Sequence, residues 1–222
     1  DPEKIVEVMG RLCYRSFKPG LNPNVTRVRE HNKDYIENVL KVKHGSVIEH
    51  PTLSFIFADV SRVFTHELVR HRVGVAISQE SLRFVRLDDL GLWLPTVIEE
   101  DSKAVEIFVR TFKELERLQL ELAEHFKLDD EAVPFHKKKT VTSAMRRIAP
   151  IGLSTTIGWS ANPRTIRWLL ETRTDPSAEE EIRLVFGKVG EIVTKRYPYL
   201  FGDFKTEMID GLPCYKPHSS KV

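Results

Sequence analysis

Apolar residues recur at helical spacing along much of this 222-residue chain. The clearest run lies at residues 101–126, where valine, phenylalanine and leucine side chains repeat every three or four positions and predict one long helix with one apolar face. Helices therefore dominate the predicted fold. Weaker patterns of the same kind predict further helices at about residues 2–12, 27–43, 61–72, 163–173 and from residue 177 onward, and one that ends near residue 147.

Local signals mark where several of these helices begin and end. Asn162 followed by Pro163 is a residue pair favoured at a helix start. Ser177 and Glu180 have the spacing of a capping box, in which each side chain bonds the backbone of the other residue. Gly45 is typical of a residue that ends a helix, and we expect it to end the helix over residues 27–43.

Three short segments are typical of strands. At residues 53–60 apolar side chains occupy both alternating sets of positions, and residues 82–87 and 153–159 are shorter candidates. No repeat, low-complexity tract or linker divides the chain. We therefore predict an α+β fold: one helix-rich domain over residues 1–222 with a small, mostly antiparallel sheet, and an irregular tail at residues 205–222.

Composition and charge exclude several classes of protein. Apolar residues make up 41% and charged residues 30% of the chain, as in globular rather than disordered proteins. The net charge of +2 does not indicate an obligate nucleic-acid binder. Two cysteines do not make a disulfide scaffold, so we expect reduced thiols and a cytoplasmic location. No segment has the pattern of a membrane span, and because the sequence starts at Asp1 we expect its N-terminus to be incomplete.

Common metal, nucleotide and hydrolase motifs are missing from the sequence. His66 and His71 stand in a segment similar to the zinc-binding helix of metalloproteases, but they are five residues apart rather than four. On a helix this spacing turns the two imidazoles about 140° away from each other, so we predict no metal site. The chain also lacks a glycine-rich phosphate loop and a nucleophile elbow. Any nucleotide must therefore be bound by other groups.

Arginine and histidine are combined with small polar residues in three segments, at residues 43–50, 70–83 and 146–173. The forked guanidinium of arginine suits phosphate and carboxylate groups because it donates two hydrogen bonds at once. Several arginines beside apolar segments therefore indicate a cleft for a polyanionic ligand. The alternative is that these arginines lie on solvated helix faces and form ordinary ion pairs.

Together these segments resemble the flavin-dependent thymidylate synthase family, over about residues 11–204. The family has a His-Gly-Ser/Thr segment, then an Arg-His-Arg motif followed by a serine. Later in its chain come an arginine before a proline, an Asn-x-Arg pattern and a further arginine. In this sequence the matching positions are residues 44–50, Arg70, His71, Arg72, Ser81, Arg146, Asn162, Arg164 and Arg173, in the family's order.

The resemblance implies an enzyme that methylates the uracil of dUMP at C5 to give dTMP. In the family, 5,10-methylenetetrahydrofolate supplies the carbon, and FAD that NADPH has reduced supplies the hydride. The family's enzymes are homotetramers with active sites at subunit interfaces. We therefore expect FAD as cofactor, dUMP, folate and NADPH as small-molecule partners, a cytoplasmic homotetramer, and neither nucleic acid nor membrane as a partner.

The resemblance also assigns roles to residues. The expected FAD contacts are His44, Ser46, Glu49, Arg70, His71, Arg72, Gln79, Asn162, Arg164 and Trp168. The expected substrate contacts are Glu67, Arg70, Gln79, Glu80, Ser81, Leu82, Arg83, Arg146 and Arg173. Of these, Arg173 is the expected catalytic residue, because a guanidinium against the N3–C4=O edge of uracil would stabilise negative charge there. The alternative is that Arg173 only complements the dipole at its helix end.

Some positions depart from the family pattern. Eight residues, where the family usually has seven, lie between the Arg-His-Arg motif and Ser81, which we expect to bind the nucleotide rather than attack it. Phe84 replaces a usual tyrosine, Glu67 stands where glutamine is common, and Trp168 and Ser177 occupy positions that often hold polar and histidine residues. Two alternatives stay open: a relative that binds FAD and a pyrimidine nucleotide but modifies it differently, and a non-enzymatic nucleotide- or RNA-binding protein.

Overall fold

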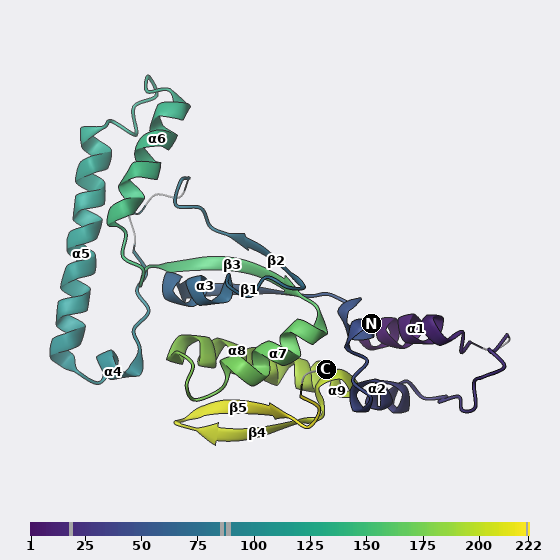
Figure 1. Cartoon of the computed structure of the whole chain (residues 1–222). Coiled ribbons are helices and arrows are strands. Elements are labelled where there is room, and N and C mark those ends of the chain that lie inside the picture. Colours follow the sequence, from purple (N-terminus) through teal and green to yellow (C-terminus); the bar gives the residue numbers. More distant parts are fainter. Residues whose placement is uncertain (18–19, 85–86, 88–89, 221) are drawn as a thin grey trace. The chain divides into compact units, whose positions relative to one another are not determined.

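The structure is a computed structural model of the chain and describes residues 1–17, 20–84, 87, 90–220 and 222 (Figure 1). Contacts within the chain define two compact units. The first unit comprises Asp1–Phe55, His71–Ala76 and Trp159–Val222, and the second comprises Ile56–Arg70 and Ile77–Gly158. The expectation of one domain over the whole chain stays a prediction.

One sheet is built from strands whose residues belong partly to the first unit and partly to the second. It contains β1 (Leu53–Ser61), β2 (Val75–Gln79) and β3 (Ser154–Ala161) in the order β1-β3-β2. The side chains of the central strand β3 alternate between half-buried and buried positions along its whole length. This alternation is the period of two that a sheet imposes.

The first unit has its core between two helices and a hairpin. Ile166 and Leu169 on α7 and Ile182 and Phe186 on α8 are completely buried. Figure 1 shows the hairpin of β4 and β5 against these helices, and β5 contacts both. The elements of this unit beside the shared sheet are α1 (Pro2–Tyr14), α2 (Asn32–Lys41), the 3₁₀ helix η1 (Gly45–Glu49), α7 (Pro163–Arg173), α8 (Glu180–Arg196), α9 (Pro198–Phe201), β4 (Phe204–Ile209) and β5 (Leu212–Pro217).

A buried ion pair joins α7 to the segment before the hairpin. The Arg167 guanidinium donates to both carboxylate oxygens of Asp203, at 2.6 and 2.8 Å, and to the Leu200 carbonyl oxygen at 2.6 Å. Asp203 also accepts from the backbone N–H of Ser219 at 3.1 Å. The Arg167 side chain is only 5% exposed. Because a buried charge is tolerated only when it is paired, this pair fixes how α7 sits on its core.

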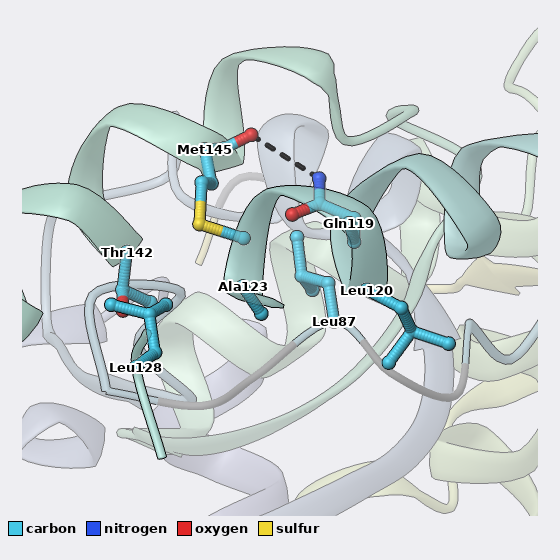
Figure 2. Close-up of a pocket in the computed structure, with 7 residues that line it drawn as sticks. All are labelled: Leu87, Gln119, Leu120, Ala123, Leu128, Thr142 and Met145. Atoms are coloured by element: carbon cyan, nitrogen blue, oxygen red, sulfur yellow. Dashed lines mark hydrogen bonds between the residues drawn. The ribbon is translucent and has the colours of Figure 1, made fainter. Parts of the chain in front are cut away.

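The second unit contains a pair of helices on either side of a small hollow (Figure 2). Its elements beside the shared sheet are α3 (Arg62–Leu68), α4 (Thr96–Glu99), α5 (Ser102–His125), α6 (Phe135–Met145) and the 3₁₀ helix η2 (Arg146–Ile148). Within the hollow the buried side chain of Gln119 donates its amide N–H to the Met145 carbonyl oxygen at 3.2 Å. A buried amide needs such a partner, so this bond holds the end of α6, and with it Arg146, against α5.

Several predictions about helices are confirmed. The long helix expected at residues 101–126 is α5, which Asp101 caps by accepting from the N–H groups of Lys103 and Ala104. The helix start at Asn162 and Pro163 is the start of α7. The α+β prediction is confirmed as well, since the fold is helix-rich with small sheets. None of the helices formed by the described residues has the length and apolar character needed to cross a membrane.

Two predictions about extended segments are wrong. No strand forms over the described part of residues 82–87: β2 lies earlier, and residues 82–84 make a turn, while 85 and 86 lie outside the described residues. The tail at residues 205–222 is not irregular, because most of it forms the antiparallel hairpin of β4 and β5. Its turn is made by Asp210 and Gly211, whose φ angles of 52° and 75° are those that a tight hairpin turn requires.

The structure also corrects the ends of two helices. The helix expected over residues 27–43 is the shorter α2, and Gly45 starts η1 instead of ending that helix. The left-handed residue after α2 is Lys43, with φ of 59°. The helix expected from residue 61 to 72 also ends sooner, at Leu68.

The capping box at α8 is wrong too. The cap is Glu179, whose carboxylate accepts from the N–H groups of Glu181 at 2.8 Å and Ile182 at 3.3 Å. The Ser177 hydroxyl instead donates to Asp175 at 2.6 Å and closes the turn before the helix. The backbone N–H of Ser177 also donates to Asp175, at 3.0 Å. The hydroxyl bond first and this N–H bond second hold the pKa of Asp175 below its usual range.

We expect Asp203→Ala to lower the free energy of unfolding by about 3 kcal/mol or more, because it leaves the Arg167 charge buried without its partner. Urea denaturation followed by circular dichroism measures this change. The matched control is Glu207→Ala, which removes the fully exposed partner of Lys216 in the same hairpin and should change stability little. Equal effects of the two substitutions would contradict a structural role for the buried pair.

Candidate active site

The start of α7 holds the loop that follows the Arg-His-Arg motif. The Asn162 side chain accepts from the N–H of Thr165 at 2.9 Å, and the Asn162 N–H donates to the Gly74 carbonyl oxygen at 3.1 Å. The Thr165 hydroxyl donates to the Val73 carbonyl oxygen at 2.8 Å. Gly74 has a φ of +69°, and a Cβ there would clash with the Asn162 amide. Glycine is therefore required for this close approach, which fixes the chain directly after Arg72.

Trp168 and Arg173 of α7 both contact the imidazole of His71. The Nε of Arg173 donates to Nε2 of His71 at 2.8 Å. An arginine cannot accept, so the imidazole is neutral and carries its proton on Nδ1. The ring of Trp168 meets the His71 ring edge to face, with 4.9 Å between centroids. The guanidinium of Arg173 is thus oriented by a residue from the motif rather than left at a solvated helix end.

Arg164 lies near the 3₁₀ helix η1 and is half-exposed. Its Nη1 is 2.5 Å from the Glu49 carboxylate, and its Nε donates to the Val222 carbonyl oxygen at 2.9 Å. A Cβ at Gly45 would lie 2.8 Å from this guanidinium, so the glycine of the His-Gly-Ser segment makes room for it. His44 beside it stacks on Tyr14, with 5.8 Å between ring centroids.

A second cluster lies in the second unit, around Arg62. The Arg62 guanidinium donates to the Glu80 carbonyl oxygen at 3.0 Å and to the Thr155 hydroxyl at 3.4 Å. Its buried Nε has no hydrogen-bond partner among the residues that the structure describes. The pKa of Arg62 is lowered, first by burial and further by the positive charge of Arg146, against the opposing effect of Glu80. Two arginines near each other with an unused buried donor are suited to binding an anion.

The residues after β2 are held by bonds within the second unit. The Glu80 carboxylate accepts from the backbone N–H of Thr156 at 2.9 Å, and Gln79 donates its amide N–H to the Thr65 hydroxyl at 3.1 Å. Ser81 starts a tight turn, in which its hydroxyl accepts from the N–H of Arg83 at 3.3 Å. These bonds fix the backbone from which the exposed Arg83 side chain projects.

The family model of the thymidylate synthase complementing protein matches residues 1–199 of the chain. The chain belongs to this family. It is 35% identical over 215 residues to a flavin-dependent thymidylate synthase of Corynebacterium diphtheriae, covering 95% of this chain and 82% of that one. It is 35% identical over 213 residues to the enzyme of the same name from Corynebacterium glutamicum, covering 94% and 82%. These matches confirm the resemblance found in the sequence.

A solved structure shares the fold of this family member. The crystal structure of thymidylate synthase X from Helicobacter pylori, determined with FAD and dUMP, aligns with a TM-score of 0.64. The two sequences are 22% identical, and the alignment covers 91% of this chain and 94% of the other. At this identity the likeness concerns the fold alone.

The residues predicted for the site divide between the two units. The residues predicted to contact FAD lie mainly in the first unit, and those predicted to contact the substrate lie mainly in the second. Apart from the cap Asn162, all of them are exposed or half-buried, so their side chains are accessible. The first-unit residues are His44, Ser46, Glu49, His71, Arg72, Asn162, Arg164, Trp168 and Arg173, and the second-unit residues are Glu67, Arg70, Gln79, Glu80, Ser81, Leu82, Arg83 and Arg146. Their individual roles remain predictions.

The sequence analysis did not single out Arg62. Ser61 before it was expected only to cap a helix, and it does so by accepting from the N–H of Phe64 at 3.1 Å. One feature of the sequence could have pointed to Arg62. It is an arginine that directly follows an apolar strand, at the first position of a helix, where a buried residue is more common than a charged one.

We expect Gly74→Ala to destabilise the protein more than Gly211→Ala. Both glycines have φ near +70°, but a Cβ at Gly211 meets nothing within 4 Å, whereas one at Gly74 clashes with Asn162 and Thr165. Gly211→Ala, the control, should therefore lower the free energy of unfolding only by the cost of a positive φ for alanine, about 1–2 kcal/mol. Thermal unfolding of both variants checks this. Similar losses would show that the contact between the motif loop and α7 does not constrain the chain.

Proposed function

We propose that the protein is a flavin-dependent thymidylate synthase, which converts dUMP to dTMP. The carbon comes from 5,10-methylenetetrahydrofolate and the hydride from FAD that NADPH has reduced. Family membership over residues 1–199 carries this proposal, together with relatives of that name at 35% identity. The two clusters of arginine and histidine supply binding groups for the cofactor and the nucleotide.

The first unit offers side chains that fit FAD. Arg72 and Arg164 are exposed guanidiniums and Ser46 is an exposed hydroxyl, which suit a pyrophosphate in the absence of a glycine-rich loop. Trp168 is 49% exposed and presents an aromatic surface beside His71. When bound, FAD supplies the hydride, and these side chains bind and orient it.

The second unit offers groups for the phosphate of dUMP. Arg62 and Arg146 repel each other, and a phosphate between them would relieve this repulsion. The buried Nε of Arg62, which has no partner among the described residues, would then lie near a negative charge. Arg83 projects from the turn that starts at Ser81. We therefore assign the nucleotide phosphate to these arginines, with Ser81 as a binding residue. Calorimetric titration tests the assignment, since Arg62→Gln should bind dUMP more weakly at unchanged flavin content.

Arg173 is the residue that we assign to catalysis. Its positive charge beside the N3–C4=O edge of uracil would stabilise the negative charge that develops when C5 becomes nucleophilic. His71 acts on Arg173 as a positioning residue, because its lone pair at Nε2 holds the guanidinium Nε in one direction. A group oriented before the reaction loses no energy to reorientation during it, which makes its charge effective.

We propose further that the enzyme works as a homotetramer with its sites at subunit interfaces. The family resemblance supports this, as does the separation of predicted FAD and nucleotide contacts into different units of the chain. Light scattering of the FAD-bound protein at micromolar concentration tests it, and a monomer would argue against it. The cytoplasmic location stays a prediction.

The decisive experiment is an assay with dUMP, 5,10-methylenetetrahydrofolate and NADPH, followed by identification of the nucleotide product. We expect purified protein to be yellow with bound flavin and to form dTMP, and omission of NADPH to stop turnover. A different modified nucleotide would favour a divergent relative. Colourless protein that makes no product when FAD is added would favour a non-enzymatic binding protein.

We expect Arg173→Ala to keep its fold and its FAD and to lose at least about 100-fold in turnover, the size of effect seen when an oriented electrostatic contact is removed. The matched control is Arg196→Ala, which removes an arginine from the last turn of α8 and so tests the helix-dipole alternative. Near-normal turnover of Arg173→Ala would leave this arginine as a helix-end charge.

A further inference from the structure

α6 and the short helix after it carry positive charge without compensation from their own sequence. From Phe135 to Arg147 there are three lysines, two arginines and one histidine, and no aspartate or glutamate. α5 in the same unit is different, because its Arg117 pairs with Glu114 and Glu121 at 2.8 Å. Pairs at spacings of three and four residues neutralise a helix surface, and α6 lacks the acidic partners to form them.

Several of these cations share one face of the helix. His136, Lys139, Ser143 and Arg147 follow each other at spacings of three or four residues and Thr140 lies beside them, so the five residues form one stripe, here called the cationic face, whose permanent charges are Lys139 and Arg147. All five side chains are exposed or half-buried. The stripe is distinct from the side of α6 that carries Thr142 and Met145, which line the hollow against α5 (Figure 2).

The cationic face continues to the turn that we assign to the nucleotide. The Lys139 ammonium lies 4.8 Å from the centre of the Phe84 ring. Phe84 closes the turn, because its N–H donates to the Ser81 carbonyl oxygen at 3.0 Å. At the other end of α6, Arg146 is close enough to Arg62 to repel it. Positive charge therefore stands at both ends of this surface, at residues 136–139 near the turn and at Arg146 and Arg147 after α6, with uncharged residues 140–145 between them.

We propose that the cationic face of α6 binds the carboxylates of an oligo-γ-glutamate chain, the polyanionic tail that folate cosubstrates carry. The inference rests on the proposed function, which makes a folate the carbon donor. From His136 to Arg147 the face is about 16 Å long at 1.5 Å per residue. Such a chain has one carboxylate in each residue, and lysine and arginine form their stronger hydrogen bonds with carboxylates.

A nucleic acid fits the same surface less well. Proteins that bind single strands combine a basic groove with several aromatic side chains on which bases stack. Next to the cationic face the described residues offer Phe84, over whose ring the Lys139 ammonium already lies, and the exposed Phe135 at the start of α6. The net charge of the chain is also only +2. A flexible polycarboxylate needs cations and no series of stacked rings, and α6 itself carries one exposed aromatic side chain, Phe135.

The test compares the KM for 5,10-methylenetetrahydrofolate with one glutamate and with five. We expect the pentaglutamate to have a roughly three- to tenfold lower KM, the size of effect that a few exposed charge pairs provide. The double variant Lys139→Gln/Arg147→Gln should lose this preference while its KM for the monoglutamate stays unchanged. The matched control is Arg110→Gln/Lys113→Gln on α5, which removes two exposed charges from the same unit and should keep the preference.

The outcomes separate this inference from the proposed function. Turnover with equal KM for both folates, or a preference that survives in the double variant, overturns the inference and leaves the synthase activity intact. If neither folate supports turnover, the proposed function fails, and the binding of a fluorescent penta-γ-glutamate peptide to wild type and double variant decides the inference. Tighter binding of a single-stranded RNA of equal charge, lost in the double variant, would overturn it in favour of a nucleic-acid surface.

Discussion

The ion pair between Arg167 and Asp203 is the constraint on which the first unit depends. Arg167 lies on α7 between Arg164 and Trp168, yet its side chain is buried and theirs are accessible. Because a buried guanidinium must keep its carboxylate, α7 cannot rotate without breaking two short hydrogen bonds. That constraint turns Arg164 and Trp168 outward. Asp203 also accepts from the backbone N–H of Ser219, so the same carboxylate joins the residue before β4 to the segment after β5.

Burial separates two kinds of arginine that look alike in the sequence. Arg167 and Arg183 are nearly inaccessible and donate to the backbone carbonyl oxygens of Leu200 and Ile209, although the buried Nε of Arg183 has no hydrogen-bond partner among the described residues. Arg164 and Arg146 are exposed and can take part in binding. In the sequence, solvated helix faces were an alternative for the arginines of residues 146–173, which include Arg146, Arg164 and Arg167. The arginines that stabilise the fold are the buried ones, Arg167 and Arg183. Residue spacing alone does not reveal which arginines are buried.

Elements with a local cause could be predicted from the sequence, and those with a distant cause could not. α5 and the start of α7 follow from helical spacing and caps. The strand β2 was not predicted, because Val75–Gln79 is short and becomes a strand only by pairing with β3, far away in the chain. The hairpin was not predicted, although Asp210 and Gly211 are a strong turn signal. The cap at Glu179 was missed because Ser177 matched a familiar pattern.

The candidate site was predictable in its motifs and not in its electrostatics. Arginine, histidine and serine at family spacing identified the groups on α7 and on the turn at Ser81, because few residue types bind phosphate. Arg62 belongs to no motif. Its importance comes from a buried Nε for which the described residues supply no partner, and from the repulsion of Arg146. Glu80 opposes the effect of burial and of Arg146 on the pKa of Arg62, and an anion bound near the two arginines would act in the same direction as Glu80. An anion that binds there, as proposed, would stabilise the folded second unit, since any ligand that binds the folded state preferentially stabilises it.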